Sequence, residues 1–127
     1  MVEATPGGAP WNVRALGPYG TIEADTPEEK GGRGDGWRPH DLLEASVATC
    51  LTISIRMAAA RLGLDAESVE VRAWIDRADP DAPVLRYTAR VPGLDPASEE
   101  RLLAEVESFP VQQTLSRLAL APRERWE

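Results

Sequence analysis

Residues 39–64 read PHDLLEASVATCLTISIRMAAARLGL, and this stretch decides the fold of the chain. Pro39 is suited to the first turn of a helix, and the acidic Asp41 follows it at the end where the helix dipole favours negative charge. Gly63 is the kind of residue that ends a helix. The pattern therefore predicts a helix over residues 39–62. Apolar residues occupy most of its faces, which is typical of a buried helix.

Two segments of alternating character follow this helix. Residues 68–76 alternate apolar and polar side chains, and residues 84–91 do the same after the turn signal Asp79-Pro80-Asp81. A period of two residues places one set of side chains on each face of a strand. The two segments are therefore predicted to form a β-hairpin with one buried face.

The remaining segments complete an α+β pattern. Before the long helix, residues 11–16 and 19–24 are predicted to pair as strands around Gly17-Pro18. After the hairpin, Asp95 and Pro96 start a helix that is expected to end near Ser108, and Pro110 opens a short helix to about Leu118. Residues 119–127 are predicted to be either an edge strand or a frayed end. The order of strands, helix, hairpin and two helices indicates one α+β domain over residues 1–127.

Composition excludes several classes of function. The chain has 127 residues and a formal charge of −7, and it has no run of Lys and Arg, so we expect no nucleic-acid partner. His40 is its only histidine and Cys50 its only cysteine, so we expect no metal centre, no internal disulfide and no cofactor. The ten N-terminal residues do not resemble a secretory signal, and the longest uncharged stretch, 45–55, is far shorter than the ~20 residues of a membrane span. A cytoplasmic protein without a membrane partner is expected.

The long helix carries a specific set of residues around its cysteine. They are Pro39, Asp41, Leu42, Leu43, the small residues Ala45, Ser46 and Ala48, then Cys50 followed by Thr52. This set resembles the central helix of the OsmC/Ohr family, the osmotically inducible and organic-hydroperoxide-resistance proteins. Residues 100–118, ERLLAEVESFPVQQTLSRL, resemble the family's second landmark, in which Cys-Pro-Val precedes a short Thr-Leu-Ser helix. Phe109 stands at the cysteine position of that landmark.

The resemblance implies a fold and a reaction. The implied fold has two curved antiparallel sheets wrapped around long central helices in an intertwined homodimer. The implied reaction is the reduction of an organic hydroperoxide, a small-molecule substrate, by Cys50, in defence against oxidative stress. Family members resolve the oxidised cysteine with the second cysteine. Because Phe109 replaces it here, the resemblance implies an OsmC-like branch that depends on an external thiol reductant.

The resemblance also points to the residues that would activate the thiol. In such proteins an N-terminal arginine stabilises the thiolate, and an acidic residue at the start of the helix orients the arginine. His40 stands where the hydroperoxide-resistance branch has a glutamate, and Asp41 matches the acidic position of other branches. The candidate arginines are Arg14, Arg33 and Arg38.

A second interpretation of the same residues stays open. A cysteine within an apolar helix is often an inert small hydrophobe, and a ring at Phe109 can shape an apolar pocket. Phe109 and Val47 are the candidate lining residues of that pocket. The alternative function is therefore a noncatalytic OsmC-like protein that binds an apolar small molecule.

Overall fold

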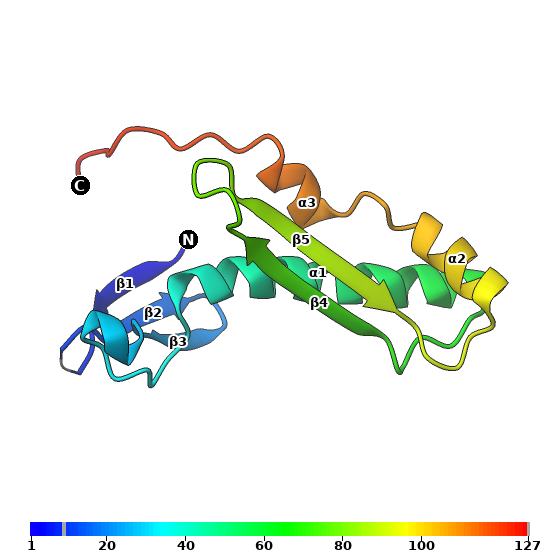
Figure 1. Cartoon of the computed structure of the whole chain (residues 1–127), viewed down its shortest axis with the longest axis horizontal. Coiled ribbons are helices and arrows are strands. Elements are labelled where there is room, and N and C mark those ends of the chain that lie inside the picture. Colours follow the sequence, from blue (N-terminus) through cyan, green and yellow to red (C-terminus); the bar gives the residue numbers. More distant parts are fainter. Residues whose placement is uncertain (9, 127) are drawn as a thin grey trace. The chain divides into compact units, whose positions relative to one another are not determined.

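The computed structural model describes residues 1–8 and 10–126 (Figure 1). Contacts divide the chain into two compact units, which are described separately below. The first comprises residues 1–45 and 74–86, and the second comprises residues 46–73 and those from 87 onward. The elements are, in order, β1 (Glu3–Pro6), β2 (Val13–Gly17), β3 (Gly20–Ala24), the 3₁₀ helix η1 (Glu28–Lys30), α1 (Pro39–Leu62), β4 (Glu70–Asp76), β5 (Val84–Arg90), α2 (Pro96–Ala104) and α3 (Pro110–Leu115).

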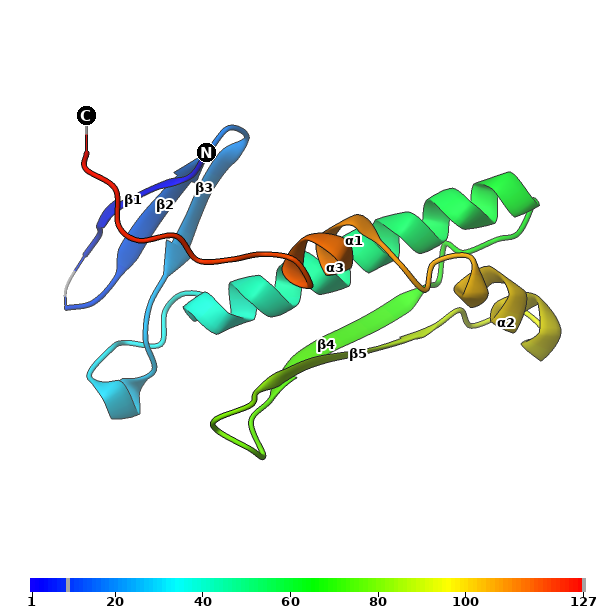
Figure 2. The same cartoon turned by 90° about the horizontal axis from the view of Figure 1, so that it is seen from above.

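The first unit contains a three-stranded antiparallel sheet in the order β1-β2-β3, which Figure 2 shows from above. Gly17 pairs with Gly20, so Pro18 and Tyr19 form the turn between β2 and β3. The predicted pairing of these two segments is confirmed. Strand β1 was not predicted, because its four residues are all exposed and carry no apolar alternation.

A buried carboxylate organises the loop that joins β3 to α1. Asp25 accepts hydrogen bonds from the backbone N–H groups of Thr26 (2.7 Å) and Arg33 (3.1 Å). The Thr26 hydrogen bond is the main reason that the pKa of Asp25 lies below its usual range. Trp37 closes the loop, since its N–H donates to Glu23 and its carbonyl accepts from Asp25. Residues 30–36, KGGRGDG, are thus tied to Asp25 and Trp37 just before the helix.

Helix α1 has the predicted bounds, Pro39–Leu62. Gly63 follows it in the left-handed region, with φ 68°. The Gly63 N–H donates to the Ala60 carbonyl (3.4 Å) and the Leu64 N–H donates to the Ala59 carbonyl (2.9 Å). These two bonds form a Schellman motif, which satisfies the last carbonyls of the helix.

The second unit buries one side of α1. Its core side chains come from α1, the loop after it and the segments after β5, and they are Val47, Leu51, Ile55, Ala58, Ala59, Ala66, Val91, Leu102, Val106 and Phe109. The opposite side remains open, with Ile53 58% and Met57 59% exposed. The prediction of a helix buried on most faces is therefore wrong for a single chain, which supplies neighbours for one side only.

The length and composition of α1 would also allow it to cross a membrane, and 28% of its most apolar window is buried. The expectation of no membrane span rested on the short uncharged stretch at residues 45–55. Length and composition are weak evidence for a membrane span, because core helices of soluble proteins meet the same criterion.

The hairpin prediction is confirmed by β4 and β5, which lie side by side in both views. The alternation along β4 places Val71, Ala73 and Ile75 on the more buried face. Helix α2 begins as predicted, since Asp95 caps it by accepting the Ser98 N–H (3.0 Å).

Two helix ends and the tail differ from the predictions. Helix α2 ends at Ala104, four residues before the predicted end, and α3 ends at Leu115. At the end of α2 the hydrogen bonds tighten, since the Glu105 N–H donates to the Leu102 carbonyl (3.2 Å) and the Val106 N–H to the Leu103 carbonyl (3.1 Å). Within the described part of the tail, residues 119–126, no strand is present, and Glu127 lies outside the described residues.

Candidate functional site

Cys50 lies in the middle of α1 and its side chain is half-buried. Val47 and Leu51, which flank it along the helix, are buried. The neighbouring Thr52 hydroxyl donates to the Ala48 carbonyl (2.8 Å), so this polar group is satisfied within the helix. The chain therefore covers the thiol only in part, beside the buried Val47 one turn before it.

Arg38 and Asp41 form a close ion pair where α1 begins. The Arg38 guanidinium donates from Nη2 to Oδ1 (2.6 Å) and from Nε to Oδ2 (3.0 Å) of Asp41. The backbone N–H of Arg38 also donates to Oδ2 (2.9 Å), so the carboxylate caps the first turn and holds the guanidinium at once. The guanidinium lowers the pKa of Asp41, and the carboxylate raises the pKa of Arg38.

The other predicted activating residues are placed differently. Arg14 pairs with Glu23 across the β2–β3 sheet, at 2.9 Å between Nε and Oε1. Arg33 contributes its backbone N–H to Asp25 in the loop. His40 is exposed in the first turn of α1. Of the three candidate arginines, the structure therefore brings only Arg38 together with the predicted acidic residue, Asp41.

Phe109 and Val47, the predicted pocket residues, are both buried, with 1% and 2% exposure. Tyr87 on β5 meets the Phe109 ring edge-on, with centroids 5.4 Å apart and planes at 83°. The ring at the position of the family's second cysteine is thus packed in the core of the second unit. Tyr87 was not singled out from the sequence, although the alternation of residues 84–91 places it on the same face as Leu85 and Ala89.

Glu44 is another residue that sequence reasoning did not assign a role. Its Oε1 accepts the backbone N–H of Ile75 on β4 (2.9 Å). The acids Asp41 and Glu44, which are close in sequence on α1, therefore have different partners. No group of three potential metal-ligating side chains occurs among residues 1–8 and 10–126.

Comparison with known proteins decides the family. A family profile described as OsmC-like protein matches residues 32–118, which include α1 with Cys50 and the Phe109-Pro110 segment. The chain belongs to the OsmC-like protein family. None of the curated proteins gives a significant match to this OsmC-like chain.

Solved structures share the OsmC fold over most of this chain. An organic hydroperoxide resistance protein OsmC from Legionella pneumophila is 22% identical, with TM-score 0.67 over 92% of this chain and 88% of its own. One from Elizabethkingia anophelis is 20% identical, with TM-score 0.60 over 83% and 79%. An OsmC-like protein from Mycoplasma pneumoniae is 15% identical, with TM-score 0.67 over 93% and 87%. At these identities the likeness establishes the α+β OsmC fold.

Proposed function

We propose that this OsmC-like chain is a cysteine-dependent peroxidase that reduces organic hydroperoxides with an external thiol. The observation that carries the proposal is the position of Cys50, half-buried on the central helix of the segment that matches the family profile. Two of the similar structures are named as organic hydroperoxide resistance proteins, which supports a hydroperoxide substrate.

The reaction follows from the chemistry of a single thiol. The Cys50 thiolate attacks one oxygen of the O–O bond, the bond breaks, and the alkoxide leaving group takes a proton and departs as an alcohol. Cys50 is then a sulfenic acid. One external thiol condenses with it to give a mixed disulfide and water, and a second external thiol releases Cys50 and forms the external disulfide. Because Cys50 is the only cysteine in the chain, both reducing equivalents come from outside.

The Arg38–Asp41 pair is the favoured activating element. A guanidinium that is fixed by two hydrogen bonds loses less side-chain entropy when it binds a further anion. Asp41 is the positioning residue in this scheme, because it holds Arg38 through both side-chain and backbone contacts. Residues 38 and 50 are about 18 Å apart along α1 of one chain, so Arg38 would act on the thiolate and the departing oxygen of the other subunit of the proposed homodimer.

We further propose a homodimer located in the cytoplasm. The open side of α1 supports the dimer, because an uncovered apolar helix face in a single chain favours association. A reducing compartment that supplies small thiols suits an enzyme with one cysteine.

Stopped-flow measurement of hydroperoxide consumption tests the function. Wild-type protein with dithiothreitol and cumene hydroperoxide should turn over, and Cys50→Ser should reduce the rate to that of the buffer. Equal rates for wild type and Cys50→Ser would rule out the peroxidase.

Binding of an apolar small molecule is the second candidate function, because Phe109 replaces the thiol at the resolving position. Thiol labelling separates the two candidates. If Cys50 stays unlabelled at pH 8 in folded protein but labels readily in urea, the thiol is inert and the binding function is preferred.

A further inference from the structure

Asp25 is the only buried charged side chain among residues 1–8 and 10–126, and the reaction proposed above does not use it. Its Oδ1 accepts the backbone N–H of Thr26, and its Oδ2 accepts that of Arg33. These two donors replace the water that a carboxylate loses on burial, so the ionised form is stabilised in the folded chain. The side chain therefore closes the loop between Thr26 and Arg33.

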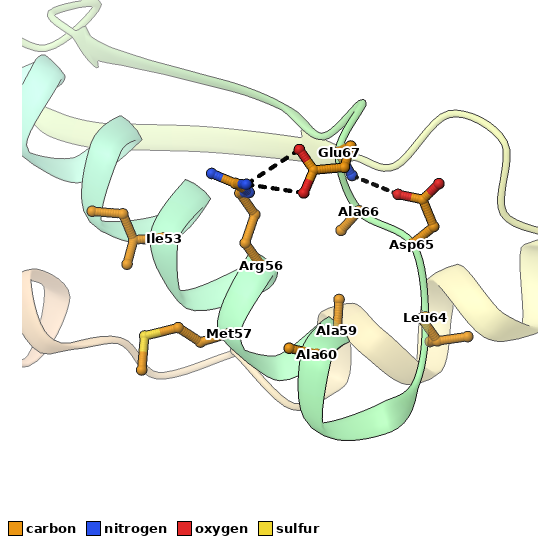
Figure 3. Close-up of a pocket in the computed structure, with 9 residues that line it drawn as sticks. All are labelled: Ile53, Arg56, Met57, Ala59, Ala60, Leu64, Asp65, Ala66 and Glu67. Carbon is orange, nitrogen blue, oxygen red and sulfur yellow. Dashed lines mark hydrogen bonds and ion pairs between the residues drawn. The ribbon is translucent and has the colours of Figure 1, made fainter.

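An exposed carboxylate elsewhere in the chain provides a contrast. Figure 3 shows Glu67, whose two oxygens accept hydrogen bonds from Nη2 of Arg56 (2.9 and 3.2 Å) beside a hollow of about 430 Å³. The Glu67 side chain is 78% exposed, so water competes for both partners and the pair contributes little to the position of either. The Asp25 carboxylate is covered, and its partners are backbone groups with little freedom to move.

The loop that Asp25 closes leads directly into Arg38. The Asp25 N–H donates to the Trp37 carbonyl (3.0 Å), and the Trp37 N–H donates to the Glu23 carbonyl (3.1 Å). Gly36 packs tightly at this crossing, because a Cβ there would lie 2.7 Å from the Glu23 carbonyl oxygen. The backbone that enters Arg38 is therefore held against the end of β3.

The same loop also brings a charge towards Arg38. The hydrogen bond and the charge of Asp41 are the main reasons that the pKa of Arg38 is raised, and the charge of Glu29 in η1 adds to them. Glu29 lies between Thr26 and Arg33, the two residues that the Asp25 carboxylate joins. Closing the loop thus places both the backbone before the guanidinium and one of the acids that attract it.

We infer that Asp25 is a positioning residue of the proposed reaction, which holds Arg38 in place by closing the loop of residues 26–37. The inference rests on the proposed peroxidase and on Arg38 as its activating group. Asp25 itself contacts neither hydroperoxide nor thiol in this scheme. Without its carboxylate, Arg38 keeps its charge but loses the fixed position from which it acts on the thiolate of the other subunit.

A double-mutant cycle between residues 25 and 38 tests the inference. Asp25→Asn keeps the size of the side chain but exchanges one acceptor oxygen for an amide donor, so one loop N–H loses its partner. With cumene hydroperoxide and dithiothreitol, Asp25→Asn alone should lower kcat/KM by about fivefold or more. In the Arg38→Gln background it should change kcat/KM by less than about twofold, because no guanidinium is left to position.

Two variants control for the change from carboxylate to amide. Asp35→Asn alters an exposed carboxylate of the same loop, and Glu67→Gln alters the exposed pair of Figure 3. Both should stay within about twofold of wild-type kcat/KM. If Asp25→Asn does not fold, Gly36→Ala strains the same crossing through its Cβ and should give the same cycle with Arg38→Gln.

The pH profile of Cys50 alkylation by iodoacetamide gives a readout that loss of structure does not imitate. In Asp25→Asn the profile should move to higher pH, because a misplaced guanidinium favours the thiolate less. In the Arg38→Gln background, Asp25→Asn should not move it further. Partial unfolding would instead expose the half-buried thiol and speed its alkylation.

The outcomes separate this inference from the proposed function. Equal rates for wild type and Cys50→Ser would overturn both. If wild type is active but the substitutions at residues 25 and 38 lower kcat/KM independently, or Arg38→Gln has no effect, the peroxidase stands and the role of Asp25 is wrong. An unmoved alkylation profile in Asp25→Asn would also overturn that role. A loss of activity that requires Arg38, together with the shifted profile, supports it.

Discussion

Tyr87, which is 40% exposed, packs edge-on against the buried ring of Phe109, so an aromatic ring holds the place that a second cysteine would occupy. Such a pair contributes about 0.5–1.5 kcal/mol beyond the burial of its area. Replacing Phe109 with cysteine therefore tests two things: whether position 109 can meet Cys50, and how much the aromatic packing contributes to stability.

If the proposed function is right, Phe109→Cys should form a disulfide with Cys50 within one chain and no longer need an external thiol to resolve it. Removal of a fully buried ring should lower the free energy of unfolding by about 3 kcal/mol. Mass spectrometry after one equivalent of cumene hydroperoxide should show the loss of two hydrogens within one chain.

The control for this variant is Phe109→Ser, which leaves a comparable cavity without a thiol. A disulfide requires Cα atoms within about 7 Å of each other. Overoxidised or unmodified Cys50 in folded Phe109→Cys would show that residues 50 and 109 do not meet.

Arg38→Gln should lower kcat/KM for hydroperoxide by about tenfold or more, because it removes the charge proposed to favour the thiolate. Arg14→Gln and Arg33→Gln should stay within about twofold of wild type. Arg38→Lys should recover little activity, since an ammonium cannot reproduce the two hydrogen bonds to Asp41. A larger loss in Arg14→Gln or Arg33→Gln than in Arg38→Gln would assign the activation to another arginine.

Lowering the pH should reduce the stability of the first turn of α1. The Arg38 guanidinium is the main reason that the pKa of Asp41 lies below its usual value. A carboxyl whose pKa is lower in the folded state stabilises that state above its unfolded pKa of about 3.9, and the contribution is lost as the pH falls through the folded value.

Carbon-detected NMR titration of the Asp41 carboxyl measures this effect. Arg38→Gln should raise the observed pKa towards the unfolded value, whereas Arg14→Gln should not change it. Because the pair faces solvent, added salt should reduce the shift. An unchanged titration of Asp41 in Arg38→Gln would contradict the structure at this end of the helix.

Gly63→Ala should lower the free energy of unfolding by about 1 kcal/mol, because a side chain at φ 68° is strained. Gly8→Ala is the matched control, since a Cβ at Gly8 meets no atom within 4 Å and its φ is not positive. Urea denaturation of the two variants gives the comparison. Equal midpoints would mean that the Schellman turn does not require glycine.

Elements whose ends or faces are set by nearby residues were predicted correctly from the sequence. Pro39 and Gly63 mark the two ends of α1 correctly, because a proline start and a left-handed glycine end are local properties of the backbone. The alternation of apolar and polar residues likewise predicted strands β4 and β5 from the local sequence. Strand β1 has no such pattern, and its position depends on pairing with β2, which is a contact between segments.

The site was less accessible to prediction than the fold. Cys50 and Asp41 were predicted from the resemblance of the helix to the OsmC/Ohr family and stay predictions, whereas the preference for Arg38 among three arginines required the contacts of each side chain. The buried role of Asp25 and the ring contact of Tyr87 depend on residues far away in sequence. Periodicity reports which face a residue occupies, and it does not report which partner the residue meets.

The Glu44–Ile75 hydrogen bond fixes the register of β4 against α1. A strand that slides by one residue exchanges its two faces, so Ala73 and Ile75 would turn outward and Trp74 would turn inward. The Ile75 N–H lies at the edge of a two-stranded sheet, where unpaired backbone groups invite further strands. By occupying that donor, a single carboxylate both favours one alignment of β4 on α1 and removes an attachment point for misassembly.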